Sequence, residues 1–253
     1  MRTLEGLLRA LVGLVFLGVM VALGIVCLIP LLPWHPLRIK FTNHFGTVVG
    51  SGIMHISGCK VRVHGKEHVH SSRPAIYAGN HTSIFDAFTS IWLSPVGTVG
   101  VAKREIIYYP FYGLAWILAG HLLIDRGRTE RAKASMAKMG AFVKQHGLHI
   151  FMLPEGTRAS DGRLLPLKKG IVYLALQTGL PIVPMVTVGA HKAWIKGSLL
   201  LRKVPIDITF LPPIDTTGWS EDRVDEHLET LKAAFVAALP EDQRPLDVSL
   251  EPA

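Results

Sequence analysis

No charged side chain occurs between Ala10 and Trp34, and most of this run is leucine, valine, isoleucine or glycine. A helix of roughly 20 apolar residues crosses the hydrocarbon core of a bilayer, so the run is long enough to do so. The apolar part of a signal peptide has only about 7–15 residues and precedes a cleavage site with small side chains. This run is longer and ends in the proline-containing segment Ile29–Trp34, which does not resemble such a site. We therefore predict a membrane-inserting helical segment that stays in the mature protein.

Two modes of insertion are compatible with this segment. Basic residues flank it on both sides, namely Arg2, Arg9, Arg38 and Lys40. They give no strong orientation by the positive-inside rule. Prolines at positions 30, 33 and 36 end the helix, and a second, moderately apolar stretch covers Phe41–Ser57. The pattern predicts either a spanning helix or a pair of helices that enters one leaflet and returns.

The overall composition is that of a folded, basic protein. The 253 residues are 49% hydrophobic and 18% charged, which disfavours a disordered chain, and the formal net charge is +8. This charge indicates an anionic partner: a nucleic acid, a phosphorylated substrate or an anionic membrane. The positive mean hydropathy of +0.34 favours the membrane over a nucleic acid. The two cysteines, Cys27 and Cys59, are too few for a disulfide framework or a cysteine-rich zinc site.

Short apolar runs alternate with helical patterns after residue 58. Strands are predicted at Lys60–His64, Ala75–Gly79, Thr98–Ala102, Leu122–Asp125, His149–Leu153, Ile182–Val188 and Ile206–Leu211. Helices are predicted at Thr129–His146, Leu167–Thr178 and Glu221–Leu239. Strands separated by helices indicate an α/β fold with a mostly parallel central sheet flanked by helices. The predicted organisation is a pair of membrane-anchoring helices (1–57), an α/β domain (58–239) and a polar C-terminal tail (240–253).

The first polar motif follows the predicted strand Ala75–Gly79 and contains His81 and Asp86. On one continuous helix a spacing of five residues separates two side chains by about 140°, so they would not meet. Ser83 is a good N-cap, however, with Asp86 at the third helical position. His81 then lies on the loop before the helix, where the carboxylate can orient the ring and leave the other nitrogen free as a base. Alternatively, Asp86 only caps the helix and His81 is an ordinary loop residue.

The second polar motif, Glu155–Arg158, also follows a predicted strand. Ligands of open α/β sheets bind at the C-terminal ends of the strands, where this motif is expected to lie. Gly156 permits a tight turn, and Arg158 offers a planar fork of donors that suits a phosphate group. Glu155 is expected to hold a backbone amide or a substrate hydroxyl, or to orient the basic groups. The alternative is a surface turn with a solvated arginine.

Other segments offer further candidates. Lys103 and Arg126 both end predicted strands and can converge with Arg158 on an anion, although each alone is also explained as a surface charge. The segment Tyr108–Leu118 is aromatic and apolar, so we predict that it packs in the core. The alternative for this segment is the lining of an acyl groove.

Four blocks of the chain occur together in a recognisable order. They are His-x4-Asp at 81–86, Pro-Phe-x-Gly and Ile-Asp-Arg within 110–126, Pro-Glu-Gly-Thr-Arg at 154–158, and Ile-Val-Pro at 182–184. Together they resemble the blocks of the glycerolipid acyltransferase family, specifically the 1-acylglycerol-3-phosphate acyltransferases of bacterial type. The resemblance covers roughly residues 60–215. Leu153 stands where many members have phenylalanine, which is a conservative change.

The resemblance implies a role for each matching residue. His81 is implied to be the catalytic base, and Asp86 its orienting partner. The implied substrate-binding residues are Lys103, Arg126, Glu155, Gly156, Thr157 and Arg158. Among the second-block cations, Lys103 is the better candidate for a phosphate ligand. No metal and no cofactor is expected.

The resemblance also implies the reaction and its location. An acyl group would pass from acyl-CoA or acyl carrier protein to the free hydroxyl of a lysophospholipid, above all 1-acylglycerol-3-phosphate, to give phosphatidate. The residue types fit direct attack assisted by His81, and we expect Ser83 to cap a helix rather than act as a nucleophile. The partners are then these substrates and the lipid bilayer, without a nucleic acid. The expected location is the cytoplasmic (inner) membrane, with the catalytic domain facing the cytoplasm.

Three other functions are compatible with the same residues. One is the same chemistry on another acceptor, such as a lyso-ornithine lipid, lysophosphatidylcholine or glycerol-3-phosphate. A metal-dependent phosphohydrolase is the second, but it needs three or more convergent ligands and only His81 and Asp86 are grouped. The third is a non-catalytic lipid-binding protein, for which His81→Ala would leave function intact.

Overall fold

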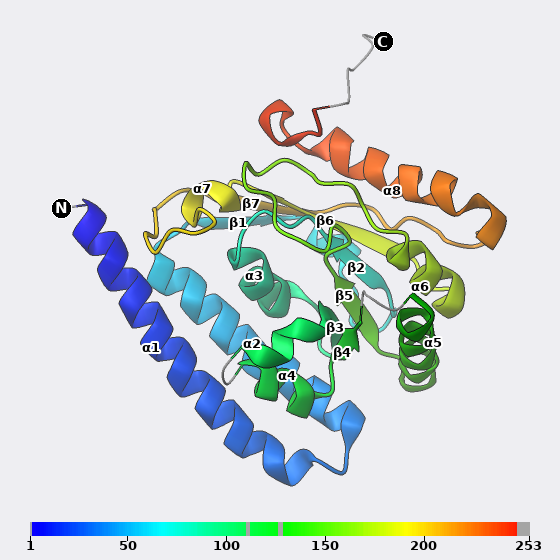
Figure 1. The fold of residues 1–253 in the computed structure, drawn as a ribbon, viewed down its shortest axis with the longest axis horizontal. Coiled ribbons are helices and arrows are strands. Elements are labelled where there is room, and N and C mark those ends of the chain that lie inside the picture. The colour runs from blue at the N-terminus through cyan, green and yellow to red at the C-terminus, as the bar shows by residue number, and fades with distance from the viewer. Residues whose placement is uncertain (1, 110–111, 126–128, 247–253) are drawn as a thin grey trace.

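The computed structural model describes residues 2–109, 112–125 and 129–246, and it is built around one seven-stranded sheet (Figure 1). The strands are β1 (Val61–His64), β2 (Ile76–Gly79), β3 (Thr98–Lys103), β4 (Leu122–Ile124), β5 (His149–Met152), β6 (Ile182–Val188) and β7 (Ile206–Phe210). Their order in the sheet is β1-β7-β6-β2-β5-β3-β4. Neighbouring strands are parallel except for β6 and β7, which are antiparallel. The predicted mostly parallel α/β sheet is therefore confirmed, and the end of each predicted strand differs by one residue at most.

Helices cover both faces of this sheet. They are α1 (Arg2–Leu28), α2 (His35–Ser57), α3 (Phe85–Leu93), α4 (Tyr112–Ala119), α5 (Thr129–His146), α6 (Gly170–Thr178), α7 (Ala190–Ala193) and α8 (Val224–Ala238). The helix predicted at Thr129–His146 has the same bounds in the structure. The helix predicted from Leu167 begins only at Gly170, because the backbone N–H of Lys168 donates to the carbonyl of Pro154 at 2.9 Å and so belongs to the preceding loop.

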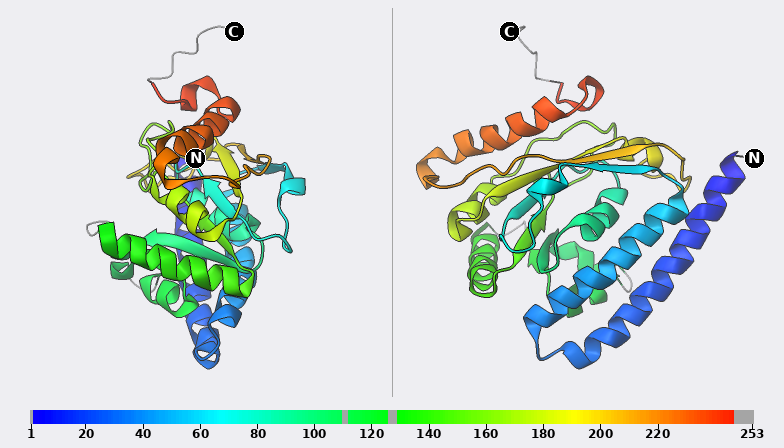
Figure 2. Two further views of the ribbon diagram at one scale, coloured as in Figure 1. Left: turned by 90° about the vertical axis from the view of Figure 1, so that its right-hand side faces the viewer. Right: turned by 180° about the vertical axis from the view of Figure 1, so that it is seen from behind.

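The alternation of side chains along β2 shows how the two layers are built. Ile76 and Ala78 are buried in a core with side chains of α5, α6 and α8. Tyr77, between them, is buried on the other face with side chains of α2 and α3. Figure 2 shows these two helical layers on either side of the sheet, with α1 outside α2. The fully buried central strands explain why the predicted strands are nearly continuous apolar runs.

The second helix of the N-terminal hairpin is bonded into the α/β domain. The buried side chain of Asn43 in α2 accepts hydrogen bonds from the backbone N–H groups of Gly97 and Thr98, both at 2.6 Å. It also donates to the carbonyl oxygen of Thr98 at 3.0 Å. Asn43 therefore ties α2 to the start of β3, and the domain boundary predicted at residue 57 stays a prediction.

The first helix has an unusual surface. The segment Thr3–Leu31 is long and apolar enough to cross a membrane, yet only 17% of its most apolar window is buried. Large apolar side chains are therefore exposed along α1, among them Leu4, Leu8, Leu11, Leu14, Val15, Val19, Leu23 and Val26. Figure 1 shows α1 along the edge of the molecule, where it contacts α2 and α4.

Two expectations from the sequence are wrong in the structure. Tyr108 and Tyr109, expected in the core, lie at the end of a short 3-10 helix and are 79% and 58% exposed. Residues 240–246 are not simply a tail, since Gln243 is buried, and the rest of the predicted tail lies outside the described residues. The side chain of Gln243 accepts from the N–H of Gly189 at 3.1 Å and donates to the carbonyl of Gly162 at 3.2 Å.

Candidate active site

Three neighbouring parallel strands bring the predicted site residues to one edge of the sheet. His81 follows β2, the segment Glu155–Arg158 follows β5, and Lys103 is the last residue of β3. The C-terminal ends of parallel strands meet at the same edge, which is where ligands of open α/β sheets bind. The two polar motifs are directly bonded to each other there, because the N–H of His81 donates to the carboxylate of Glu155. The N–H of Ala159, just after the second motif, also donates to the carbonyl of His81 at 3.0 Å.

His81 and Asp86 form the expected pair. The Nδ1 atom of the His81 ring lies 3.2 Å from Oδ2 of Asp86. The same oxygen accepts the backbone N–H groups of Thr82 and Ser83 at 2.6 and 2.7 Å. Asp86 is buried, whereas the His81 side chain is 18% exposed. A buried carboxylate at Nδ1 selects the ring form that carries its proton there, so Nε2 is free to accept a proton.

The start of α3 differs in detail from the predicted N-cap at Ser83. The helix begins at Phe85, and Ile84 occupies the N-cap position without a side-chain cap. The Ser83 hydroxyl oxygen nevertheless accepts the backbone N–H of Phe85 at 3.4 Å, and the hydroxyl donates to the carbonyl of Trp194 at 3.3 Å. The carboxylate of Asp86 still reaches the N–H three residues earlier, as in a capping box. Asp86 therefore both caps this turn and contacts His81, so the two readings of the motif are not exclusive.

Glu155 supports the loop that carries His81. Its side chain is buried, and one carboxylate oxygen accepts the backbone N–H of His81. The other accepts the N–H of Leu165 at 2.8 Å. Burial raises the pKa of Glu155 to about 8, and these two hydrogen bonds oppose the rise. Both oxygens are thus committed to the backbone, so Glu155 fits the predicted role of holding a backbone amide and not that of a substrate ligand.

We predict that Glu155→Gln lowers the free energy of unfolding by about 1–3 kcal/mol, since the amide NH₂ would face a backbone N–H and leave it unpaired. Burial raises the pKa of Glu155 in the folded protein above its ordinary value of about 4.5. Its contribution to stability is therefore complete below about pH 4.5 and is lost as the pH rises to about 8. Urea unfolding in detergent measures the free energy of unfolding at each pH. In the wild type this free energy should fall as the pH rises through the range, and in Glu155→Gln this downward slope should be absent.

The matched control for this experiment is Glu229→Gln on the exposed surface of α8, which should keep the wild-type slope. An identical slope in the wild type and Glu155→Gln would contradict the assignment of the slope to this carboxyl.

The rest of the second motif is more open to solvent. Gly156 has a φ of 72°, a left-handed conformation that favours glycine. Thr157 is exposed and Arg158 is half-buried. The backbone of Arg158 is held from outside the motif, because the Nζ atom of Lys196 donates to its carbonyl oxygen at 3.2 Å. The backbone of Arg158 thus lies on a turn that is bonded to the loop of His81 through the next residue, Ala159.

The two other predicted cations have different outcomes. Lys103 is exposed at the end of β3, on the same edge of the sheet as His81. Arg126 lies outside the described residues. The structure therefore gathers His81, Asp86 and the second motif by direct contacts and places Lys103 two strands away from β2.

Two supporting residues were not predicted. Asn80 directly precedes His81, and its amide donates to the carbonyl of Thr187 at 2.9 Å while its oxygen accepts the N–H of Thr187 at 2.7 Å. This pair ties the start of the His81 loop to β6. Gln243 holds the loop at Gly162 from the C-terminal end of the chain. The asparagine beside His81 was a usable signal, but nothing in the sequence connects residue 243 with this site.

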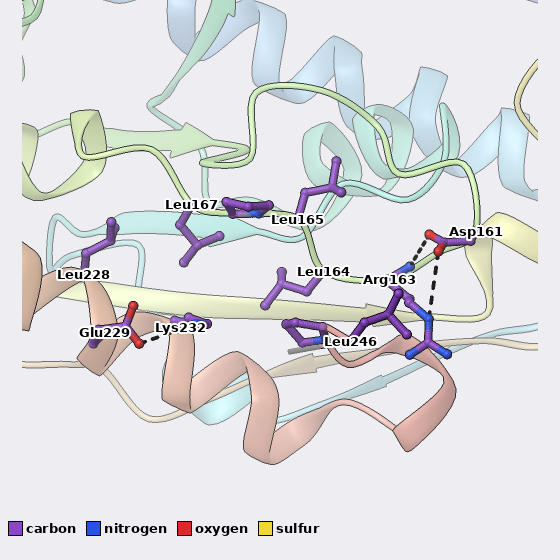
Figure 3. Close-up of a pocket in the computed structure, with 11 residues that line it drawn as sticks. Asp161, Arg163, Leu164, Leu165, Leu167, Leu228, Glu229, Lys232 and Leu246 are labelled. Carbon is purple, nitrogen blue, oxygen red and sulfur yellow. Dashed lines mark hydrogen bonds and ion pairs between the residues drawn. The ribbon is translucent and has the colours of Figure 1, made fainter. Parts of the chain in front are cut away.

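A separate cavity of about 440 Å³ lies between the loop at 161–167 and α8 (Figure 3). Leucines and prolines line much of it, and neither His81 nor Asp86 does. Leu165 lines this cavity while its backbone N–H donates to Glu155. Within the described part of the chain, no group of three or more His, Cys, Asp or Glu side chains could hold a metal ion. A reaction without a metal or cofactor stays a prediction.

Comparison with known proteins gives consistent matches. A model of the acyltransferase family matches residues 60–188, which include both polar motifs. The 1-acyl-sn-glycerol-3-phosphate acyltransferase of Limnanthes douglasii is 45% identical over 226 residues, or 89% of this chain and 79% of the relative. The Escherichia coli (strain K12) protein of the same name is 31% identical over 208 residues, or 81% and 83%. The fold is similar to the 1-acyl-sn-glycerophosphate (LPA) acyltransferase of Thermotoga maritima, with a TM-score of 0.71, 22% identity and coverage of 91% of this chain and 94% of that one.

Proposed function

Because this chain belongs to the acyltransferase family, with relatives that are 1-acyl-sn-glycerol-3-phosphate acyltransferases, we propose that it forms phosphatidate from 1-acylglycerol-3-phosphate and an acyl thioester. The observation that carries this proposal is the His81–Asp86 pair, held at the C-terminal edge of the sheet beside Arg158. The test is acylation of lysophosphatidate by the purified protein.

The geometry of the pair supports a direct attack of the acceptor on the thioester. Nε2 of His81 removes the proton from the free hydroxyl of the acceptor as the hydroxyl oxygen attacks the thioester carbonyl. Asp86 stabilises the imidazolium that forms, through its contact with Nδ1. The attack forms the new C–O bond and the tetrahedral intermediate. Collapse of this intermediate restores the carbonyl and breaks the C–S bond, and the proton on Nε2 passes to the departing thiolate. No covalent acyl-enzyme is needed, and the Ser83 hydroxyl is already engaged with Trp194.

Arg158 and Lys103 are the proposed ligands of the acceptor phosphate. A guanidinium can bind two phosphate oxygens at once, whereas an ammonium acts as a point charge. Arg126 keeps its place as a further candidate from the sequence. Thr157 is exposed beside Arg158 and is available to the same headgroup. A lyso-ornithine lipid lacks the phosphate, so this arrangement favours lysophosphatidate over that alternative acceptor.

We predict that Arg158→Ala raises the KM for lysophosphatidate by about 10–100-fold, since a charged hydrogen bond is worth about 1.5–3 kcal/mol. The kcat should change much less, because the phosphate is bound alike in the ground state and the transition state. Initial rates at varied acceptor concentration measure both values. Arg62→Ala is the matched control, because Arg62 on β1 forms an ion pair at the protein surface with Asp207 on β7. A KM equal to the wild-type value would remove Arg158 from the phosphate site.

The membrane is the proposed source of the acceptor. α1 exposes its apolar side chains, yet it also packs on α2, which is bonded into the domain through Asn43. These contacts hold α1 against the side of the catalytic domain, which favours insertion of the hairpin into one leaflet over a spanning helix. We place the enzyme on the cytoplasmic face of the inner membrane, where acyl-CoA and acyl carrier protein are both available as donors. Comparing the kcat/KM for the two donors identifies the one it uses.

A further inference from the structure

We propose that the loop of residues 194–203, between α7 and β7, is a second membrane-contact element that binds anionic lipid headgroups at the N-terminal end of α1. This inference rests on the membrane association proposed above. The loop has the side chains that an interfacial segment needs. Leu199 is 75% exposed and Ile195 is 37% exposed, while the adjacent Lys196, Arg202 and Lys203 are also exposed.

Direct packing joins this loop to the apolar helix. A Cβ atom at Gly6 of α1 would collide with the side chain of Leu200 and the carbonyl oxygen of Leu201, so the backbones approach closely only because residue 6 is glycine. Lys203 forms an ion pair with Glu5. The loop therefore lies beside the charged first turns of α1, next to the point where the uncharged run begins at Ala10. Figure 1 shows it between α7 and the N-terminal end of α1.

The charges around this end of the molecule complement an anionic surface. Two further cations lie near the three of the loop. Lys60 follows Cys59, which contacts the loop, and Arg9 contacts the neighbouring end of α2. The Sγ atom of Cys59 donates to the carbonyl of Arg202, and Arg9 donates to the carbonyl of Ile56 at 3.1 Å. Glu5 forms ion pairs with two of these five cations, Arg9 and Lys203, so the charge of this group stays positive. A cationic rim beside an apolar helix is the pattern of an interfacial segment on anionic lipid.

The loop also contacts both catalytic motifs. The carbonyl of Trp194 accepts the Ser83 hydroxyl at 3.3 Å, and the Trp194 ring packs edge-on against Phe85 at 5.3 Å. Lys196 donates to the carbonyl of Arg158 at 3.2 Å. Headgroups bound by the loop are thus held next to the turns that carry His81 and Arg158. The inference is that this loop docks the open side of the site on the lipid surface from which the acceptor comes.

The test measures how full-length protein in a low concentration of detergent partitions onto vesicles of phosphatidylcholine, with and without phosphatidylglycerol. Each near-surface cation contributes about 1 kcal/mol, so Arg202→Gln should lower partitioning onto anionic vesicles about fivefold and leave neutral vesicles unaffected. Leu199→Ser should lower partitioning onto both kinds of vesicle. The controls are Lys144→Gln on α5 and Leu246→Ser, which is 82% exposed beyond α8. Acylation of lysophosphatidate in detergent micelles should be unchanged in all four variants.

The outcomes separate this inference from the proposed function. If Arg202→Gln and Leu199→Ser partition like the wild type while the wild type binds vesicles, the loop does not contact the membrane. A wild type that binds neither kind of vesicle also overturns the inference. If the variants lose partitioning but the wild type does not acylate lysophosphatidate in micelles, the inference stands and the proposed function fails.

Discussion

Replacement of His81 by alanine is expected to lower the kcat for lysophosphatidate acylation by about 10²–10⁴-fold, the contribution of a positioned general base. The KM for the acceptor should change little, since the ring is proposed to act on the reacting hydroxyl and the phosphate is bound elsewhere. The fold should persist. The backbone of His81, and not its ring, makes the bonds to Glu155 and Ala159.

The measurement is the initial rate of phosphatidate formation, together with the midpoint of thermal unfolding. His64→Ala is the matched control, because the side chain of His64 is 60% exposed on β1, far along the sheet from β2. A His81→Ala protein that is folded and keeps its rate to within a few fold would show that His81 is an ordinary loop residue.

Replacement of Asp86 by asparagine is expected to lower the kcat by a similar factor, about 10²–10⁴-fold. The asparagine oxygen can still accept the backbone N–H groups of Thr82 and Ser83, so the turn before α3 keeps its hydrogen bonds. What is lost is the negative charge beside Nδ1 of His81, and with it the stabilisation of the imidazolium. Asp86→Asn therefore tests the catalytic role of the carboxylate with little change in its capping role.

Asp86→Ala separates the two roles further. It removes the acceptor of two backbone N–H groups and should also lower the free energy of unfolding, by about 1–3 kcal/mol for each buried donor left unpaired. Denaturant unfolding of both variants, beside their rates, gives the comparison. If Asp86→Asn has the wild-type kcat while Asp86→Ala is destabilised, Asp86 is a helix cap and not a catalytic partner.

Local patterns were sufficient to predict the sheet and the edge at which the site forms. Buried strands such as Ile182–Val188 appear as short apolar runs, and polar residues that follow parallel strands share one edge. The proximity of His81 and Glu155, 74 residues apart, follows from that rule once β2 and β5 are neighbours. The order of the strands is not a local property. The hydrogen bonds between Asn80 and Thr187 form only because β6 lies next to β2, on the side opposite β5. They could not be predicted without this strand order.

The differences at the ends of the chain have a related cause. The aromatic segment from Tyr108 was taken to be buried in protein, but Tyr108 is exposed, as are the apolar side chains of α1 that were expected to meet the membrane. Composition does not distinguish a side chain that packs in a core from one that faces lipid. Polar residues were likewise taken to mark a tail, but Gln243 is buried because its amide pairs with two backbone groups of distant loops. A buried polar side chain needs hydrogen-bond partners, and which groups can serve as partners depends on the complete fold.

The most direct test of the central claim is the acylation of a panel of acceptors by the purified protein, with an acyl thioester as donor and His81→Ala as the control. The panel contains lysophosphatidate, lysophosphatidylcholine, a lyso-ornithine lipid and glycerol-3-phosphate. We predict that phosphatidate forms from lysophosphatidate with the highest kcat/KM of the panel, and that His81→Ala abolishes nearly all of it. Failure to acylate any acceptor, or an equal rate in the wild type and His81→Ala, would contradict the assignment of this site as an acyltransferase.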